Sequence, residues 1–240
     1  MKKIRYKADS RGYANHGWLK SHHTFSFANY YNPERTHFGL LRVVNDDTVA
    51  PGMGFGTHPH DNMEIISIPL QGALAHKDSM SHEQTISPGE VQVMTAGTGI
   101  THSEYNANSN EEVKFFQIWV FPREKGLKPS YDQKMFDFNT PKNNLTLIVS
   151  PDGSNGSLKV QQDVWFSIGK FNEKTEFNYT PKKSSNGLFI MVIEGDFEID
   201  GEELNRRDAV GLYEVTDQVK IKSLSSDAQL LIIDVPMQIG

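Results

Sequence analysis

The chain has 240 residues, a formal net charge of -6 and a pI of about 5.8, and it contains no cysteine. Because this acidic balance comes without a clustered basic run, nothing attracts a phosphate backbone, and direct nucleic-acid binding is not expected. The absence of cysteine excludes disulfides and thiolate nucleophiles, so a bound metal would have only nitrogen and oxygen ligands.

The N-terminal segment is basic, but the apolar stretch of a signal peptide does not follow it. No run of about eighteen apolar residues occurs in the sequence, so no membrane-spanning helix is expected. With 37% hydrophobic and 10% aromatic residues, the chain can bury cores in one large or two small domains. We therefore expect a globular, cytoplasmic protein that does not contact a membrane.

The first half contains short β-rich runs that end at Gly, Pro, Asn or Asp. They lie at residues 39–44, 64–68, 91–94 and 113–120. Many short strands separated by turn residues are typical of a β-barrel or a β-sandwich. The sequence thus predicts an all-β fold.

Four side chains in this half have the alternating spacing of ligands on β-strands. His58 and His60 would share one face of a strand, and His102 and Glu104 one face of another, each pair beside a glycine-rich turn. Three imidazoles and a carboxylate suit iron, manganese, nickel, copper or zinc, and in an octahedral field they leave two positions open for catalysis or sensing. A lone His-x-His is more often a chance pair, but two such pairs together favour a metal site.

The second half repeats the strand pattern of the first without its histidines. Residues 121–157 are rich in Pro, Lys, Asp, Asn, Gly and Ser, which indicates a connection between domains. Beyond this segment, the apolar run 188–193, the segment 195–201 and the segment 207–212 form a weak internal repeat of the first half. Residues 158–240 contain no histidine, so a second barrel cannot build the same site.

Two domains follow from this division. We predict an N-terminal metal-binding domain at residues 1–130 and a C-terminal metal-free domain, with the connecting segment, at residues 131–240. One metal ion per chain is expected, because only the first domain has the histidines.

The first motif resembles that of the cupin superfamily, in which Gly, five residues, His-x-His, three residues and Glu follow one another. Here these are Gly52, His58, His60 and Glu64, with the next glycine one place late at Gly72. The chain is similar to the pirin family in particular. The segments that carry this resemblance are 11–12, 17–19, 23–27, 42–47, 58–64, 76–79, 88–92, 97–104, 117–119 and 129–131. The second half resembles the quercetinase-like pirins of bacteria in its general pattern.

The resemblance implies two double-stranded β-helix barrels of the cupin, or jelly-roll, type in tandem. It also implies that His58, His60, His102 and Glu104 are the metal ligands. In ordinary cupins the carboxylate ligand stands where Glu64 does, whereas in pirins the glutamate two places after the last histidine has that role. A hydrogen bond to a liganding imidazole is therefore the alternative role expected for Glu64, although a regular strand leaves open which carboxylate binds.

The pirin resemblance implies a metal-dependent dioxygenase that cleaves flavonols such as quercetin with O2. The implied cofactor is one divalent transition metal, Fe(II) first, with Ni, Cu, Mn or Zn as alternatives. Glu104 would be the catalytic base that takes the proton of the flavonol 3-hydroxyl. Most of the nearby aromatic residues are expected in the core and a few in flat walls around a planar substrate; they are Phe25, Phe27, Tyr30, Tyr31, Phe38 and Phe55.

Two other functions remain open at this stage. Pirins are also associated with regulation, so the chain is alternatively a binding protein whose metal senses redox state and alters a surface that docks on a protein partner, without physiological quercetinase turnover. A sugar-phosphate isomerase or an oxalate-type cupin would need basic residues beside the metal. No Lys or Arg lies within the ligand motifs at 58–64 and 97–104, which disfavours that third class.

The remaining histidines support weaker expectations. His22 and His23 are adjacent and would face opposite sides of a strand, so they cannot both bind one ion. His23 is expected either at the pocket mouth or in a packing role, and His76 as a hydrogen-bonding residue in a loop or at a strand end. Surface positions are expected for the others, His16, His37 and His82.

Overall fold

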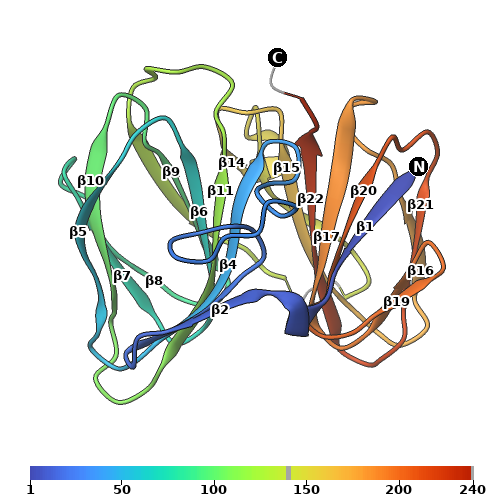
Figure 1. The fold of residues 1–240 in the computed structure, drawn as a ribbon, viewed down its shortest axis with the longest axis horizontal. Helices are drawn as coiled ribbons and strands as arrows, with labels where there is room; N and C mark the ends of the chain where they lie inside the picture. The colour runs from blue at the N-terminus through green and yellow to red at the C-terminus, as the bar shows by residue number, and fades with distance from the viewer. Residues whose placement is uncertain (139–141, 239–240) are drawn as a thin grey trace.

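The computed structural model describes residues 1–138 and 142–238 and confirms the predicted all-β architecture of two barrels in tandem. The barrels stand side by side, and each consists of a seven-stranded and a four-stranded sheet (Figure 1). The helical elements of the described ranges are two short 3-10 turns, η1 (Ala8–Ser10) and η2 (Ser154–Gly156). In the described part of the chain, no helix has the length and apolar character needed to cross a membrane.

The first barrel, blue to green at the left of Figure 1, has a large sheet of order β12-β9-β6-β11-β4-β3-β2 and a small sheet of order β5-β10-β7-β8. Neighbouring strands in both sheets pair antiparallel. The strands are β2 (Gly12–Asn15), β3 (Leu19–His23), β4 (Leu41–Val49), β5 (Gly54–His60), β6 (Glu64–Gln71), β7 (Leu74–Asp78), β8 (Glu83–Ile86), β9 (Glu90–Thr95), β10 (Ile100–Asn106), β11 (Val113–Val120) and β12 (Ser130–Met135).

The second barrel, at the right of Figure 1, is yellow to red except for the blue strand β1. It has a large sheet of order β1-β20-β17-β22-β15-β13-β14 and a small sheet of order β16-β21-β18-β19. Its strands are β1 (Lys2–Tyr6), β13 (Thr146–Ser150), β14 (Leu158–Lys159), β15 (Trp165–Phe171), β16 (Glu176–Tyr179), β17 (Asn186–Glu194), β18 (Phe197–Ile199), β19 (Glu202–Leu204), β20 (Ala209–Tyr213), β21 (Val219–Ser223) and β22 (Ala228–Pro236).

Each barrel takes a strand from beyond the predicted domain boundary. Strand β1 pairs with β20, so the beginning of the chain lies at the edge of the large sheet of the second barrel. Strand β12 begins at Ser130 and pairs with β9 of the first barrel as far as Met135. The domain boundary between residues 130 and 131 stays a prediction. Strands β1 and β12 each pair with the barrel on the other side of this boundary.

The two large sheets pack against each other and form the largest core of the molecule. Strand β11 shows how alternation divides its residues between two environments. Phe116 and Ile118 belong to the core shared with Phe166 and Ile233 of the second barrel. Phe115, whose side chain points to the opposite face of the strand, belongs to a separate apolar cluster inside the first barrel. One strand therefore supports the interface with one face and the barrel interior with the other.

Apolar side chains fill the interior of the second barrel. Phe171, Leu188, Ile190, Phe197 and Leu230 are buried there, each with at most 1% of its surface exposed. This packing differs from the interior of the first barrel, where buried polar groups are numerous.

A row of polar side chains crosses the inner face of the large sheet of the first barrel. Its members stand directly opposite one another on neighbouring strands, which places their side chains on the same face. From β3 to β12 they are His23, Asn45, Gln117, Ser67, Gln92 and Gln133. All except Gln133 are buried, so the row brings hydrogen-bonding groups into the centre of the barrel.

Two arginines converge on Asp46 between the barrels. Arg207 of the second barrel donates from Nε to Asp46 Oδ2 at 2.9 Å, and Arg11 donates from Nη1 to the same oxygen at 3.3 Å. The Arg207 side chain is 7% exposed, donates to the Ile193 carbonyl, and lies 5.1 Å from the centroid of the Phe116 ring. This guanidinium therefore joins the second barrel to the outer face of β4 and β11.

We expect Arg207→Leu to lower the free energy of unfolding by about 3 kcal/mol, because removing one partner of a buried ion pair leaves the others without compensation. Urea denaturation followed by tryptophan fluorescence measures the change. Arg206→Leu is the matched control, since Arg206 pairs with Glu194 on the surface and its loss should cost less than about 1 kcal/mol. Equal losses in the two variants would contradict a joining role for Arg207.

Candidate metal centre

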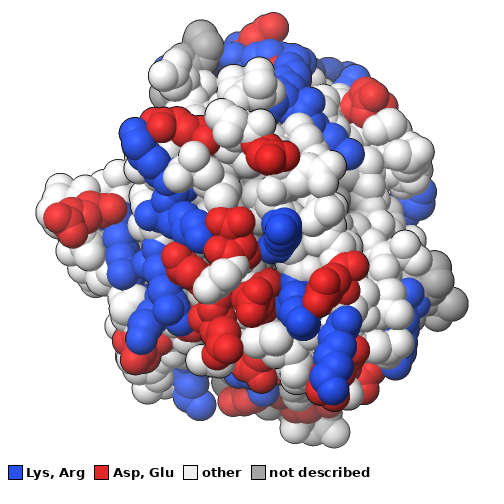
Figure 2. Space-filling model, turned by 90° about the vertical axis from the view of Figure 1, so that its right-hand side faces the viewer, with Lys and Arg blue, Asp and Glu red and all other residues white. Residues whose placement is uncertain are grey.

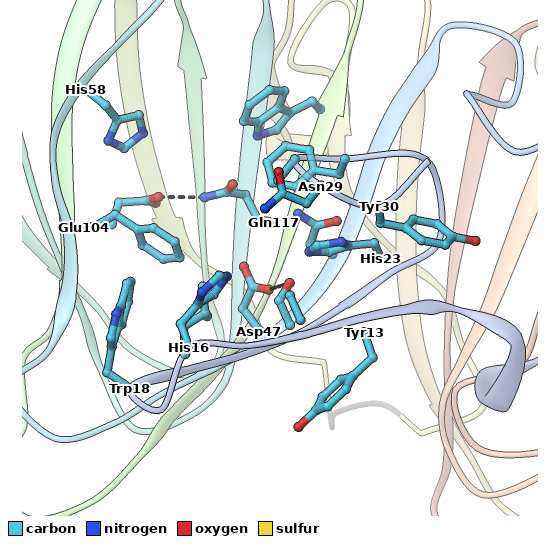
Figure 3. A pocket seen from close by; sticks show the side chains of 18 of the residues that line it. Tyr13, His16, Trp18, His23, Asn29, Tyr30, Asp47, His58, Glu104 and Gln117 are labelled. Carbon is cyan, nitrogen blue, oxygen red and sulfur yellow. Dashed lines mark hydrogen bonds between the residues drawn. The ribbon is translucent and has the colours of Figure 1, made fainter. Parts of the chain in front are cut away.

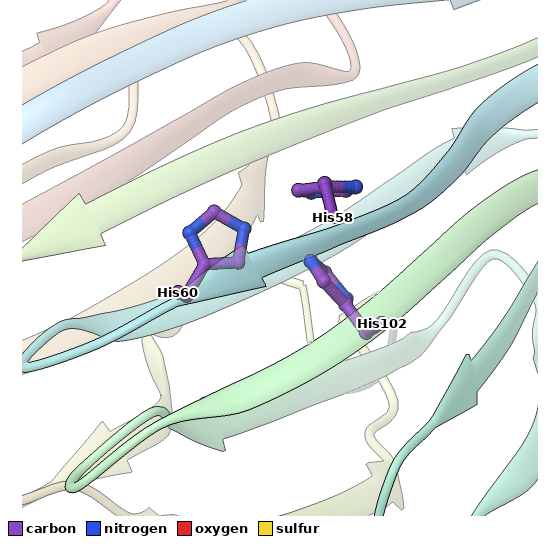
Figure 4. Close-up of side chains that lie close together, drawn as sticks. All are labelled: His58, His60 and His102. Carbon is purple, nitrogen blue, oxygen red and sulfur yellow. The ribbon is translucent and has the colours of Figure 1, made fainter.

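Three histidines of the first barrel meet at one point of the small sheet. His58 and His60 lie on β5, and His102 on β10 stands opposite His58 in the antiparallel register. Their ring centroids are 4.5 Å apart for His58 and His102, 4.8 Å for His58 and His60, and 4.9 Å for His60 and His102. Figure 4 shows the three rings gathered between the two strands. His58 and His60 therefore share one face of β5, as their spacing predicted, and the pairing of β5 with β10 brings His102 next to them.

Glycine-rich turns allow the two strands to approach. The backbone N–H of Asn62, just after β5, donates to the carbonyl of Gly97, just before β10, at 2.9 Å. Gly97 has a φ of +51°, and a Cβ there would overlap the carbonyl of Leu127, so another residue would not fit. A Cβ at Gly54 would likewise overlap the carbonyl of Glu104. Gly54 therefore allows β5 to approach β10, whereas Gly97 allows the turn before β10 to pack against the backbone at Leu127.

The histidines are in the state that a divalent metal needs. Burial lowers the pKa of His60 to about 4 and that of His102 to about 2, so both imidazoles are neutral and can ligate through nitrogen. His58 Nδ1 lies 2.8 Å from the Gly56 carbonyl, which assigns the proton to Nδ1 and leaves Nε2 for a ligand. Both ring nitrogens of His102 are buried without a hydrogen-bond partner among the described residues. A metal ion would satisfy such a nitrogen, so this donor set fits the implied group.

Glu104 faces the same interior from β10 but belongs to a second group of donors. The ligating atoms of His58, His60 and His102 lie within 4.8 Å of one another, and so do those of His76, His102 and Glu104. His102 is common to both groups. The register of β10 against β5 shifts between His102 and Glu104, which separates Glu104 from the ladder of the other two histidines. Metal ligation by all four predicted residues therefore stays a prediction.

Two donors from the polar row hold the Glu104 carboxyl. Gln117 Nε2 donates to Oε2 at 2.6 Å, and Ser67 Oγ donates to Oε1 at 3.2 Å. Burial raises the pKa of Glu104 to about 7, and these hydrogen bonds oppose part of that rise. Glu104 is thus a fixed carboxyl that can gain or lose a proton near neutral pH.

Glu64 does not take the alternative role expected for it. Strand β5 ends at His60, a turn with Asn62 at a φ of +46° intervenes, and Glu64 begins a new strand. Thr95 Oγ1 and the Gln161 backbone N–H donate to its Oε2 at 2.8 Å and 3.2 Å. The expected hydrogen bond to a liganding imidazole is therefore wrong, because an even residue offset keeps a shared face only within one continuous strand.

His76 proves to be closer to the centre than its sequence indicates. It lies within β7, opposite Glu104, and is 1% exposed. Its Nε2 is 3.3 Å from Asp78 Oδ2, and its ring centroid is 5.3 Å from that of His102. His82, expected on the surface, is half-buried and places Nδ1 2.9 Å from the same Asp78 oxygen. The hydrogen-bonding role of His76 is confirmed, but its expected place in a loop or at a strand end is wrong, because His76 is the middle residue of β7. Only the pairing of β7 with β10 shows its neighbours.

A cavity of about 620 Å³ opens beside the centre, and His58, His60, Glu104 and Gln117 line it (Figure 3). Aromatic side chains form most of its apolar wall: Trp18, Phe27, Tyr30, Phe55 and Trp119. Two of these pairs stand edge to face, Trp18 with Phe55 and Phe27 with Trp119, each with centroids 5.3 Å apart. Such rings provide flat, apolar surfaces for a planar molecule.

Only some of the aromatic and histidine residues that the sequence singled out line the cavity. Phe27, Tyr30 and Phe55 line it, whereas Phe25 and Phe38 are core residues and Tyr31 is exposed. His23 lines the cavity from a buried position. Exposed His16, which was expected on the surface, also borders the cavity, because the β2–β3 connection passes over it.

Family models cover most of the chain. A model described as Pirin matches residues 5–120, and one described as Quercetinase C-terminal cupin domain matches residues 147–235.

Similar proteins are known in sequence and in structure. A quercetin 2,3-dioxygenase of Escherichia coli strain K12 is 42% identical over 234 residues, which cover 96% of this chain and 97% of that protein. A pirin-like protein of Caulobacter vibrioides is 37% identical over 229 residues, which cover 94% of this chain and 96% of that protein. The crystal structure of the bacterial pirin YhhW of Escherichia coli in complex with nickel(II) superposes with a TM-score of 0.92 at 40% identity, covering 98% of this chain and 99% of that chain.

We expect His102→Ala to lose most of its bound metal, because His102 belongs to both donor groups. The purified protein is loaded with Ni(II), dialysed and measured by elemental analysis. Wild type should carry one ion per chain, and His37→Ala, which changes an exposed histidine, should match it. Thermal melts should show a folded His102→Ala protein. Two ions per wild-type chain, or full occupancy in His102→Ala, would refute this centre.

Proposed function

Because this chain belongs to the pirin family of the cupin superfamily, we propose that it is a metal-dependent dioxygenase that cleaves flavonols such as quercetin with O2. One observation carries the proposal: the cavity of about 620 Å³ brings flat aromatic walls together with the histidine group and a buried carboxyl. The relative named quercetin 2,3-dioxygenase supports the substrate class.

The proposed ligands of the metal are His58, His60, His102 and Glu104. We propose Fe(II) as the native ion, and nickel, copper, manganese and zinc suit the same nitrogen and oxygen donors. When bound, Fe(II) would supply a Lewis acid for the 3-oxygen of the flavonol and a redox-active centre for O2.

Glu104 is the proposed acceptor for the proton of the 3-hydroxyl. A general base must be ionised before it can accept a proton. Burial raises the pKa of Glu104 to about 7, and a bound cation would lower it again, so Glu104 would be an ionised carboxylate at the working pH. The hydrogen bonds from Ser67 and Gln117 fix both carboxyl oxygens, so the acceptor is oriented before the substrate arrives.

The cavity walls would orient the substrate and exclude water. Trp119 stands edge to face with His60, with centroids 4.9 Å apart, and its indole N–H is buried without an acceptor among the described residues. It can therefore donate to a substrate oxygen close to the histidine group. Phe27 and Phe55, which also line the cavity, would provide flat apolar contacts for the substrate.

The iron- or copper-loaded protein should consume O2, bleach the near-visible absorption of quercetin and release carbon monoxide. An oxygen electrode, absorption spectra and gas analysis follow the three changes, with metal-free protein as the control. If the fully loaded protein leaves quercetin intact with Fe, Mn, Ni and Cu, the dioxygenase proposal fails and the regulatory alternative becomes the better interpretation.

Glu104→Gln should lower kcat for quercetin by about a hundredfold or more, because an amide cannot accept the proton. Metal content should fall less than activity, since an amide oxygen still coordinates weakly. Glu64→Gln is the matched control: Glu64 is also buried, and burial raises its pKa to about 7, but it lies outside the described lining of the cavity. Its effect should stay below about tenfold. Equal losses of metal in the two variants would reverse the choice of carboxylate.

A further inference from the structure

A second cluster of buried polar side chains lines the same cavity, on the large sheet instead of the small one. Ser21 and His23 of β3 stand directly opposite Asp47 and Asn45 of β4. All four are at most 3% exposed, and all four line the cavity. Figure 3 shows Asp47 and His23 on the strands that face His58 and Glu104. We refer to these four residues as the distal polar cluster.

Two hydrogen-bonding atoms of this cluster have no partner among the described residues. The Oδ1 of Asn45 and the Nδ1 of His23 are buried without one among the described residues. Asp47 receives a hydrogen bond from the Ser21 hydroxyl, its one donor in the described part of the chain. Buried polar groups are nearly always paired, and an unpaired one costs free energy. Because Asn45 and His23 also line the cavity, a molecule that occupies the cavity is the candidate partner for these atoms.

The chemistry of the cluster selects the kind of group that it would bind. Carboxyl and amide oxygens accept hydrogen bonds, so a ligand bound at Asp47 and Asn45 would have to donate hydrogen bonds to them. No Lys or Arg is among the described residues that line the cavity, so a carboxylate or phosphate at the cluster would find no basic side chain to neutralise it. Burial, with Asp46 and Glu104 nearby, also raises the pKa of Asp47 to about 7, which makes a further negative charge unfavourable there. Neutral hydroxyl groups meet these requirements.

An aromatic wall connects the metal centre to the distal polar cluster. His60 stands edge to face with Trp119 at 4.9 Å between centroids, Trp119 with Phe27 at 5.3 Å, and Phe27 with His23 at 5.3 Å. The interplanar angles are 83°, 83° and 69°. A flat molecule lying along this wall would have one polar edge at the histidine group and another at the cluster.

We propose that the distal polar cluster is a recognition site for the hydroxyl groups that a flavonol carries on the rings remote from its 3-hydroxyl, with Asp47 and Asn45 as the hydrogen-bond acceptors. This inference rests on the proposed function and adds a specificity determinant to it. Polyhydroxylated flavonols, and not merely planar aromatic molecules, are then the ligands that the cavity selects.

Anaerobic binding tests this proposal without turnover. Nickel-loaded protein under argon is titrated with quercetin and with 3-hydroxyflavone, which lacks the remote hydroxyls, and quenching of tryptophan fluorescence provides Kd. Wild type should bind quercetin about tenfold or more tightly than 3-hydroxyflavone, the worth of one or two well-placed hydrogen bonds. Asp47→Leu and Asn45→Leu should each remove most of this preference and leave the Kd of 3-hydroxyflavone within about twofold.

Asn110→Leu is the matched control, because Asn110 is exposed and lies outside the described lining of the cavity, so this variant should leave the preference intact. Near-ultraviolet circular dichroism checks folding. If Asp47→Leu does not fold, Asn45→Leu, which leaves the Ser21 to Asp47 hydrogen bond in place, decides the question. Equal affinity of wild type for both flavonols, no binding of either, or equal weakening of both in the folded variants would overturn the proposal.

The same measurements separate this inference from the proposed function. If quercetin binds with the expected preference but is not cleaved in air, the dioxygenase proposal fails and the recognition site stands. If quercetin is cleaved but binding ignores the remote hydroxyls, the recognition site fails and the dioxygenase proposal stands.

Discussion

The buried carboxyl of Glu104 is the contact on which the site of the first barrel depends. It comes from the small sheet and accepts hydrogen bonds from Ser67 and Gln117 of the large sheet, so it joins the two sheets across the interior. An ionisable group buried without such donors would cost several kcal/mol. The polar row across the large sheet supplies these donors. The interior of the first barrel therefore contains polar side chains, whereas apolar side chains fill the interior of the second.

Strand β11 shows how the pairing of two barrels supports this interior. Phe116 and Ile118 pack against the second barrel, which holds the strand from outside, while Gln117 and Trp119 face the cavity. Because interiors pack densely, a strand fixed on its outer face gives side chains on its inner face well-defined positions. The second barrel, with its apolar interior, thus serves the site of the first as a rigid support.

Sequence spacing succeeded where the relevant residues lie on one strand or in a known motif. His58 and His60 share a face because they lie on one continuous strand, and the short β-rich runs became β4, β6, β9 and β11. Sequence spacing gave the wrong contact for Glu64, because a turn interrupts the alternation between His60 and Glu64. It also did not show that His76 stands opposite Glu104. The distal polar cluster was equally hidden, because Asp47 and His23 meet only through strand pairing.

The sequence by itself determined the all-β class, the exclusion of cysteine chemistry, the family resemblance, and which residues could supply nitrogen and oxygen ligands. These follow from composition, from alternation within single strands and from motifs, all of which are local. The tertiary structure decided which side chains share an interior: Glu104 with Gln117, His76 with His102, and the cavity beside them. Such contacts depend on strand order, register and bulges, which arise from packing between segments far apart in the chain.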